Sequence, residues 1–183
     1  RERQRAQERF TDSFKEPART HGAAGWQMSR HALRATADMG FEYCSDGRST
    51  TWASIPHYPV CAGEIVSCPQ VPTNLPTLDE LIGLDGQTAE NVHDALLRRT
   101  APGSRAAADD GVASASRDHV FTLHAELEGG KLRPVLDRLL TGWKEQGYQL
   151  ATVANLYRAA AARPLPYHAV DDSAVPGRSG TLL

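Results

Sequence analysis

The stretch that most constrains this chain runs from Val120 to Gly130 and reads VFTLHAELEGG. Four apolar or β-branched residues precede His124, and a helical pattern begins at Lys131, directly after two glycines. A short apolar run that is closed by turn residues and followed by a helix is typical of a buried strand in a βα unit. His124 is then expected at the carboxyl end of that strand, where the loops of βα folds converge on one cavity. The alternative is a structural histidine whose hydrogen bonds are satisfied at a strand end.

The bulk composition restricts the class of protein. A chain of 183 residues with 40% hydrophobic and 23% charged residues is typical of soluble globular proteins. The formal charge of −2 and the lack of a basic stripe argue against a nucleic-acid partner. No apolar run is long enough to span a membrane, and no signal peptide is recognisable. The cysteines are three in number and lack CxxC spacing, which suits a reducing compartment.

The first residues already follow a helical pattern. Arg1 to Phe14 places Ala6, Phe10 and Phe14 on one face, and no N-cap residue precedes this pattern. We therefore expect the chain to begin in the middle of a domain, part of which lies upstream of Arg1.

Periodicity and turn residues predict short strands that alternate with helices, which indicates an α/β fold with parallel strand pairing. The expected helices cover 1–14, 29–39, 88–99, 131–146 and 153–162. The expected strands cover 19–26, 41–44, 64–71, 120–124 and 148–152. We predict one domain over 1–165 that carries a mobile, low-complexity loop at 101–117. The residues 166–183, with their prolines and glycines, are predicted to form a loosely ordered tail.

Polar side chains lie where three of the expected strands appear to end. They are His21, Asp46 with Arg48, and His124 with Glu126. The ends of parallel neighbouring strands share one face of a sheet, so these side chains are candidates for one site. The guanidinium of Arg48 suits an anionic group such as phosphate. A solvated turn and a polar strand end remain the alternative interpretations of Asp46, Arg48 and Glu126.

Other kinds of site fit the sequence less well. A zinc site would use Cys44, His57, Cys61 and Cys68, but their spacings match no zinc ribbon or finger, and three buried thiols explain the cysteines better. A serine hydrolase would need a GxSxG elbow, and a nucleotide site would need a glycine-rich loop before a helix. The sequence contains neither motif.

Several segments together carry a resemblance to a known family. They are HGAAGWQ at 21–27, EYCSDGR at 42–48, VPTNLPTLDELIG at 71–83, FTLHAELEGG at 121–130 and VPGRSGTLL at 175–183. In this order they resemble the C-terminal half of the polysaccharide deacetylase (NodB homology) family. Within it they are most similar to bacterial deformylases that act on undecaprenyl-phosphate-linked 4-formamido-4-deoxyarabinose. The similarity extends over nearly the whole chain.

The resemblance implies a deformed (β/α) barrel and a hydrolase that removes N-formyl or N-acetyl groups from sugars with a divalent metal. His124 is implied to be the general acid that protonates the departing amine. Trp26 matches the aromatic residue of the groove-forming motif, in which Ala23 replaces the usual arginine. Asp46, Arg48 and Glu126 are then expected to bind substrate.

The resemblance also implies a cofactor and a location. Zinc, cobalt or manganese would bind in the complete enzyme through aspartates and histidines that lie outside this chain, which has no HxxxH spacing and no aspartate pair directly after an expected strand. The lipid-linked substrate implies lipid A modification and polymyxin resistance. It also implies a cytoplasmic enzyme with peripheral contact to the bacterial inner membrane. The alternative is a non-catalytic sugar- or lipid-phosphate-binding module, or an inactive half-barrel.

Overall fold

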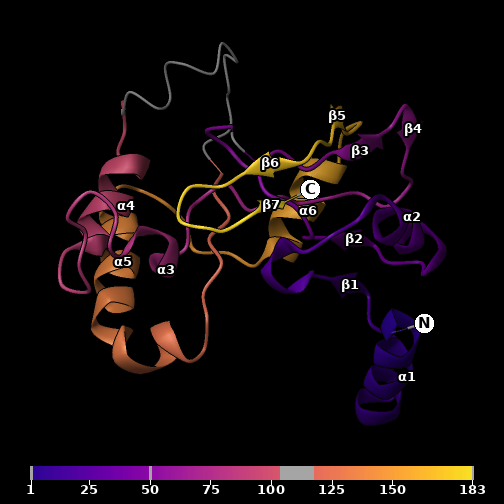
Figure 1. Ribbon diagram of the computed structural model, residues 1–183, viewed down its shortest axis with the longest axis horizontal. Coiled ribbons are helices and arrows are strands. Elements are labelled where there is room, and N and C mark those ends of the chain that lie inside the picture. Colours follow the sequence, from indigo (N-terminus) through magenta and orange to yellow (C-terminus); the bar gives the residue numbers. More distant parts are fainter. Residues whose placement is uncertain (1, 50, 104–117, 183) are drawn as a thin grey trace.

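Helices contribute most of the regular structure of this mixed α/β chain (Figure 1). The computed structural model describes residues 2–49, 51–103 and 118–182. Its α-helices are α1 (Glu2–Phe14), α2 (Arg30–Asp38), α3 (Leu78–Leu81), α4 (Val92–Thr100), α5 (Arg133–Glu145) and α6 (Val153–Ala161). A 3-10 turn covers Ala24–Trp26 and a π-helical turn covers Leu127–Lys131. The helices predicted from periodicity are therefore confirmed within a few residues at each end.

The helix ends follow the local sequence signals. The Ser29 hydroxyl accepts a hydrogen bond from the Ala32 backbone N–H at 3.2 Å, which caps α2. Gly40 follows α2 with a φ of +70°, a left-handed conformation that glycine adopts at low cost. Thr152 caps α6 in the same way, since its hydroxyl accepts from the Asn155 N–H at 3.2 Å.

The strands are short and form three small sheets. They are β1 (Thr20–His21), β2 (Tyr43–Cys44), β3 (Tyr58–Cys61), β4 (Glu64–Ile65), β5 (Tyr167–Ala169), β6 (Ser173–Ala174) and β7 (Thr181–Leu182). The strand orders are β1-β2, β4-β3-β5 and β6-β7. The expected parallel pairing is present between β1 and β2 and between β3 and β5, whereas the other pairs are antiparallel. These sheets do not close into a barrel among the residues that the structure describes.

Single bridges extend the parallel arrangement beyond β2. Cys44 pairs with Gln70, and Arg48 pairs with Thr73, both in parallel. The segment 70–73 therefore lies beside β2 and continues the order of the first sheet without being a regular strand. The side chains that follow β1, β2 and the segment 70–73 therefore lie at one edge of this sheet.

The hydrophobic core is divided between the two sides of the molecule. One cluster joins the loop before α3 to helices α3, α4 and α5, and its buried members are Leu75, Leu78, Val92, Leu96, Leu132, Val135, Leu139 and Trp143. A second cluster includes residues of α2, β2 and β3 and consists of Leu33, Phe41, Cys44, Cys61, Val66 and Cys68. A third, smaller cluster of Tyr43, Val71 and Val120 packs against side chains of α6. The three cysteines are buried and free, as predicted. In Figure 1 helices α3 to α5 stand apart from the part that carries β1, β2 and α2.

The prediction of a strand at 120–124 is wrong. The backbone there forms no strand and bonds to an irregular segment: the Leu75 N–H donates to the Val120 carbonyl at 3.3 Å, and the Val120 N–H donates to Asn74 Oδ1 at 2.9 Å. A side-chain amide thus takes the place of a neighbouring strand. Leu123, expected to be buried, is 51% exposed. The strand predicted at 148–152 is also absent from the described structure, and the one at 64–71 is limited to β4.

The predicted C-terminal tail contains β5 and the β6–β7 hairpin, and Leu182 is only 4% exposed. Its mobility stays a prediction, which hydrogen exchange would measure. Most of the loop predicted to be mobile at 101–117, namely residues 104–117, lies outside the described residues.

Helix α1 extends away from the rest of the molecule, with Phe10 and Phe14 38% and 65% exposed (Figure 1). Among the described helices, none has the length and apolar character needed to span a membrane.

Candidate functional site

The end of β1 lies beside the end of β2, and this places His21 next to Asp46. The parallel register pairs His21 with Cys44, and Asp46 follows two residues later. His21 Nδ1 is 2.6 Å from Asp46 Oδ1, a distance at which the imidazole N–H donates to the carboxylate. Asp46 is 1% exposed, whereas the His21 side chain is 25% exposed. The proximity of these two strand ends agrees with the sequence-based expectation.

Gln70 fixes the orientation of the Asp46 segment. The Asp46 backbone N–H donates to Gln70 Oε1 at 3.0 Å, and Gln70 Nε2 donates to Asp46 Oδ2 at 3.4 Å. Gln70 is itself held by two backbone hydrogen bonds to His57. Asp46 therefore sits in a preorganised position, with one carboxylate oxygen directed at His21.

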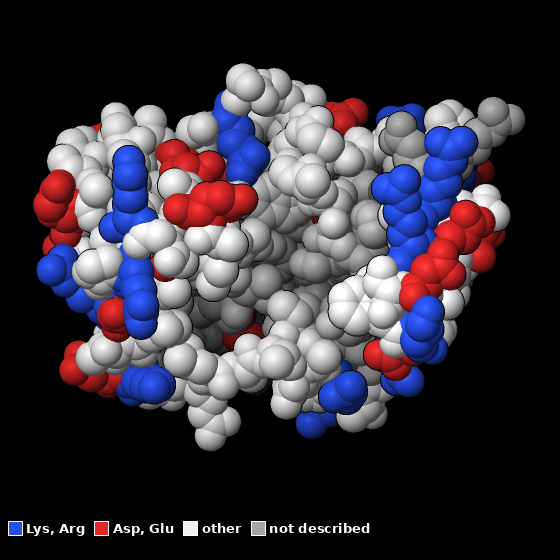
Figure 2. Space-filling view, turned by 90° about the horizontal axis from the view of Figure 1, so that it is seen from below, with Lys and Arg blue, Asp and Glu red and all other residues white. Residues whose placement is uncertain are grey.

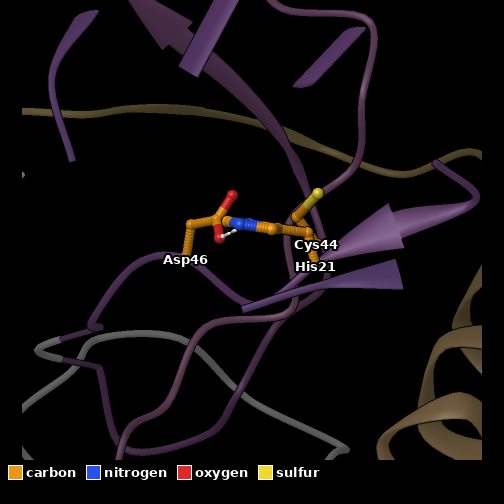
Figure 3. Close-up of side chains that lie close together, drawn as sticks. All are labelled: His21, Cys44 and Asp46. Carbon is orange, nitrogen blue, oxygen red and sulfur yellow. Dashed lines mark hydrogen bonds and ion pairs between the residues drawn. The ribbon is translucent and has the colours of Figure 1, made fainter. Parts of the chain in front are cut away.

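Cys44 completes a group of three possible metal ligands with His21 and Asp46. One donor atom from each side chain lies within 4.8 Å of the others. Figure 3 shows the Asp46 carboxylate directed at the His21 ring, with Cys44 beside His21 on the neighbouring strand. Cys44 Sγ also lies 3.5 Å from Cys68 Sγ. The hydrogen bond with Cys68 and burial both raise the pKa of the Cys44 thiol, so it stays protonated at neutral pH unless a cation displaces the proton.

Arg48 points to a different carboxylate. Its Nη1 donates to Glu80 Oε1 at 2.7 Å, and its Nη2 donates to the Leu75 carbonyl at 3.2 Å. Arg178, from the turn between β6 and β7, also donates its Nε to Glu80 Oε1. One carboxylate thus holds two guanidinium groups, and a net positive charge remains on the three side chains together.

Trp26 lies against the same two arginines. The guanidinium carbons of Arg48 and Arg178 are 4.4 and 4.6 Å from its ring centroid, within the range of cation–π attraction. Trp26 is 4% exposed, and its φ of +56° is uncommon for a large side chain. The surroundings of Trp26 must compensate for this backbone conformation, because it is intrinsically unfavourable.

Glu80 connects this arginine cluster to helix α3. Its Oε2 accepts the Thr77 backbone N–H at 3.0 Å, which is one half of a capping box. Burial alone would raise the pKa of Glu80, but hydrogen bonds from Arg48, Arg178 and the Thr77 backbone lower it below its usual value. Glu80 is therefore ionised at neutral pH although it is 1% exposed.

Asp46 and Arg48 line a cleft of about 520 Å³. Its other walls include His57 and His168, and the C-terminal segment contributes Ser173, Ala174 and Leu182. Viewed from below, the molecule is hollowed at its centre, with charged side chains of both signs on either side (Figure 2). A second cavity of about 560 Å³ lies against α5 and is lined mainly by apolar side chains such as Phe121 and Trp143.

His124 lies outside the lining of both cavities. Its side chain is 38% exposed, and its Nδ1 is 3.6 Å from Asp79 Oδ1. Glu128 is buried, and its carboxylate accepts the His124 backbone N–H at 2.7 Å. Glu126 is exposed to solvent. Since Asp79 neighbours Glu80 on α3, the histidine and the arginine cluster are connected through one short helix.

Sequence reasoning missed several residues of this region: Gln70, Asp79, Glu80 and Arg178. The T-x-x-E spacing of Thr77 and Glu80 is a capping-box signal and would have identified the start of α3. It gives no indication that Glu80 also binds Arg48 and Arg178, because these contacts join segments that are 32 and 98 residues apart.

The curated proteins that are similar to this chain include two that are named probable 4-deoxy-4-formamido-L-arabinose-phosphoundecaprenol deformylase ArnD. The protein of Shewanella sediminis (strain HAW-EB3) is 26% identical over 140 residues, which cover 76% of this chain and 39% of the relative. The protein of Wigglesworthia glossinidia brevipalpis is 22% identical over 170 residues, which cover 92% of this chain and 53% of the relative. No family model matches the chain. Over most of its length the chain is thus similar to proteins named as deformylases, and it spans about half of their length or less.

Proposed function

We propose that this chain is part of a hydrolase of the polysaccharide deacetylase (NodB homology) type. In that complete protein it would contribute the C-terminal part of a deformed (β/α) barrel. The enzyme would remove the N-formyl group from an undecaprenyl-phosphate-linked 4-formamido-4-deoxyarabinose, a reaction of lipid A modification. The observation that carries the proposal is the similarity to two curated deformylases over 76% and 92% of this chain.

His124 is proposed as the proton donor to the departing amine. A general acid must reach the leaving nitrogen, and the partly exposed His124 side chain is accessible to a substrate. Asp79 Oδ1 is 3.6 Å from His124 Nδ1, too far for a hydrogen bond, so Asp79 would act on the imidazole through its negative charge. The buried Glu128 carboxylate fixes the backbone of His124, which limits the positions that the ring can take.

Substrate binding is assigned to the cleft that contains Asp46 and Arg48. The surplus positive charge of Arg48 and Arg178 over Glu80 suits the phosphate of a lipid-linked sugar. Trp26 is covered by both guanidinium groups, so we assign it the positioning of these arginines. The two arginines also supply the positive charge that the groove-forming motif lacks at Ala23. Asp46 would accept hydrogen bonds from sugar hydroxyls, and Glu126 would contact substrate from the exposed turn after His124.

A divalent metal such as zinc, cobalt or manganese would supply Lewis acidity and activate water in the complete enzyme. The ligands implied for this metal lie outside the chain. In this arrangement the residues of the chain itself hold the substrate and deliver a proton. Peripheral contact with the cytoplasmic face of the inner membrane follows from the lipid portion of the substrate.

The test is the release of formate from the lipid-linked sugar by the complete protein and by its His124→Ala variant. We expect the variant to stay folded and to lose about 100-fold or more of kcat, the usual contribution of general acid catalysis. His31→Ala, which removes an exposed histidine from α2, is the matched control and should keep full activity. Full activity of His124→Ala would exclude the histidine from the reaction. Substrate binding without formate release by the unmutated protein would favour a binding module instead.

A further inference from the structure

We propose that His21, Cys44 and Asp46 form a binding site for a zinc-type divalent cation. The set comes from the ends of two parallel strands and the turn that follows, and one donor atom of each residue lies within 4.8 Å of the others (Figure 3). It is different from the aspartate and histidine ligands that the family resemblance implies, which belong to motifs that this sequence does not contain. The inference is independent of the proposed deformylase activity.

The first argument is the charge of the buried carboxylate. Asp46 is 1% exposed, and a buried carboxylate requires compensation by a positive charge or strong hydrogen bonds. Among the residues that the structure describes, no lysine or arginine forms an ion pair with Asp46. The nearby Arg48 is bound to Glu80 instead. The side-chain partners of its oxygens are His21 and, at 3.4 Å, the Gln70 amide. A cation bound by Asp46 would take the place of the proton that His21 and Asp46 share and would supply positive charge to this carboxylate. His21 Nδ1 and Asp46 Oδ1, 2.6 Å apart, would move apart to admit it.

The second argument is the chemistry of the donors. Nitrogen, thiolate sulfur and carboxylate oxygen together are the ligands that zinc and cobalt favour, whereas calcium and magnesium prefer oxygen alone. Three protein ligands leave one position of a tetrahedral zinc ion free, and Asp46 lies in the wall of the 520 Å³ cleft. The free position is therefore available to water or to a molecule in the cleft.

Binding exchanges one proton for the metal at Cys44. The S–H bond breaks, the proton passes to solvent, and the sulfur donates its electron pair to the cation. His21 binds in its neutral form through a ring nitrogen, and Asp46 binds as the carboxylate. No oxidant or reductant is required, because the cation does not change its oxidation state.

Cobalt(II) provides a direct test, since a thiolate ligand gives a charge-transfer band in the near ultraviolet. The reduced, chelator-treated protein is titrated with Co²⁺ and then with Zn²⁺, and its fold is followed by circular dichroism. We expect a stoichiometric band that Zn²⁺ removes. Cys44→Ser should abolish the band, and Asp46→Asn and His21→Gln should each weaken Co²⁺ binding about tenfold or more.

Cys61→Ser is the matched control, because Cys61 is a buried free thiol outside the group of three. This variant should retain the band and the affinity. The proposal is overturned if the unmutated protein gives no band, or if the band survives in Cys44→Ser. It is also overturned if folded Asp46→Asn and His21→Gln bind Co²⁺ as tightly as the unmutated protein. His21 and Asp46 would then form only an ion pair that shares a proton, and not a metal site.

Discussion

Glu80 binds two arginines and a backbone N–H with one buried carboxylate. We expect Glu80→Gln to lower the free energy of unfolding by about 3 kcal/mol, because it leaves two partly buried guanidinium groups without their counter-ion. Urea unfolding measures the change. Asp79→Asn is the control, since Asp79 is the adjacent carboxylate and is 46% exposed, and it should cost about 0.5 kcal/mol or less. An equal effect of the two substitutions would contradict the structural role of Glu80.

Arg48 is also expected to act in binding. In the complete protein Arg48→Ala should raise KM about tenfold, or ~1.4 kcal/mol, with little change in kcat, because a contact to phosphate is made equally in the ground state and the transition state. Arg34→Ala is the control: Arg34 forms an ion pair with Glu64 at 2.6 Å and does not line the cleft. A collapsed kcat at unchanged KM would exclude the phosphate role.

The stacked pair of His57 and His168 should make stability dependent on pH. Their ring centroids are 4.5 Å apart, and burial lowers the pKa of each below the ordinary value of 6.5. As the pH falls below 6.5, the unfolded chain takes up protons before the folded one does, so stability is complete above this pH and declines below it. The decline ends where the folded histidines themselves become protonated.

Urea unfolding at pH 7.5 and pH 5.5, values chosen on either side of the ordinary histidine pKa, measures this loss. His168→Phe keeps a ring against His57 and removes one titrating group, so it should reduce the loss. Carboxylates titrate equally in both proteins and cancel in the comparison. Identical losses in the two proteins would show that His168 does not contribute.

At the scale of elements, the C-terminal hairpin is held by close contact as well as by charge. Gly177, in the turn between β6 and β7, has a φ of +83°, and an added Cβ would collide with the main chain of Glu80. We expect Gly177→Ala to displace the hairpin and increase hydrogen exchange of residues 173–182, with a cost of about 1–3 kcal/mol. The clash is with backbone, which cannot move aside as a flexible side chain would.

Gly180→Ala provides the matched control for this prediction. Gly180 also has a positive φ, of +79°, but a Cβ there meets no atom within 4 Å. It should cost only the conformational strain and leave exchange in β6 and β7 nearly unchanged. Similar exchange in both variants would mean that the contact with Glu80 does not hold the hairpin.

At the scale of the whole molecule, the chain spans 39% and 53% of the length of the two relatives. We therefore expect the isolated 183 residues to release no formate from the lipid-linked sugar, while the complete protein does. A formate assay with both proteins at equal concentration tests this. Turnover by the isolated chain would show that its own residues suffice for catalysis, and His21, Cys44 and Asp46 would then be the first set to examine.

The sequence by itself determined the helices. These follow from local causes: the period of apolar residues, the hydroxyl of Ser29 and the glycine after α2 act within a few residues. It also indicated that His21, Asp46 and Arg48 follow strand ends, since that depends only on where each strand stops.

Only the tertiary structure decided which of these side chains meet. His21 contacts Asp46, but Arg48 turns to Glu80 and Arg178, while His124 lies beside Asp79. The physical reason is that buried charges choose partners by proximity and desolvation in the folded state, and neither has a local sequence signal. The segment 120–124 failed as a strand for a related reason, because Val120 bonds to the Asn74 side chain and the Leu75 backbone and not to a neighbouring strand.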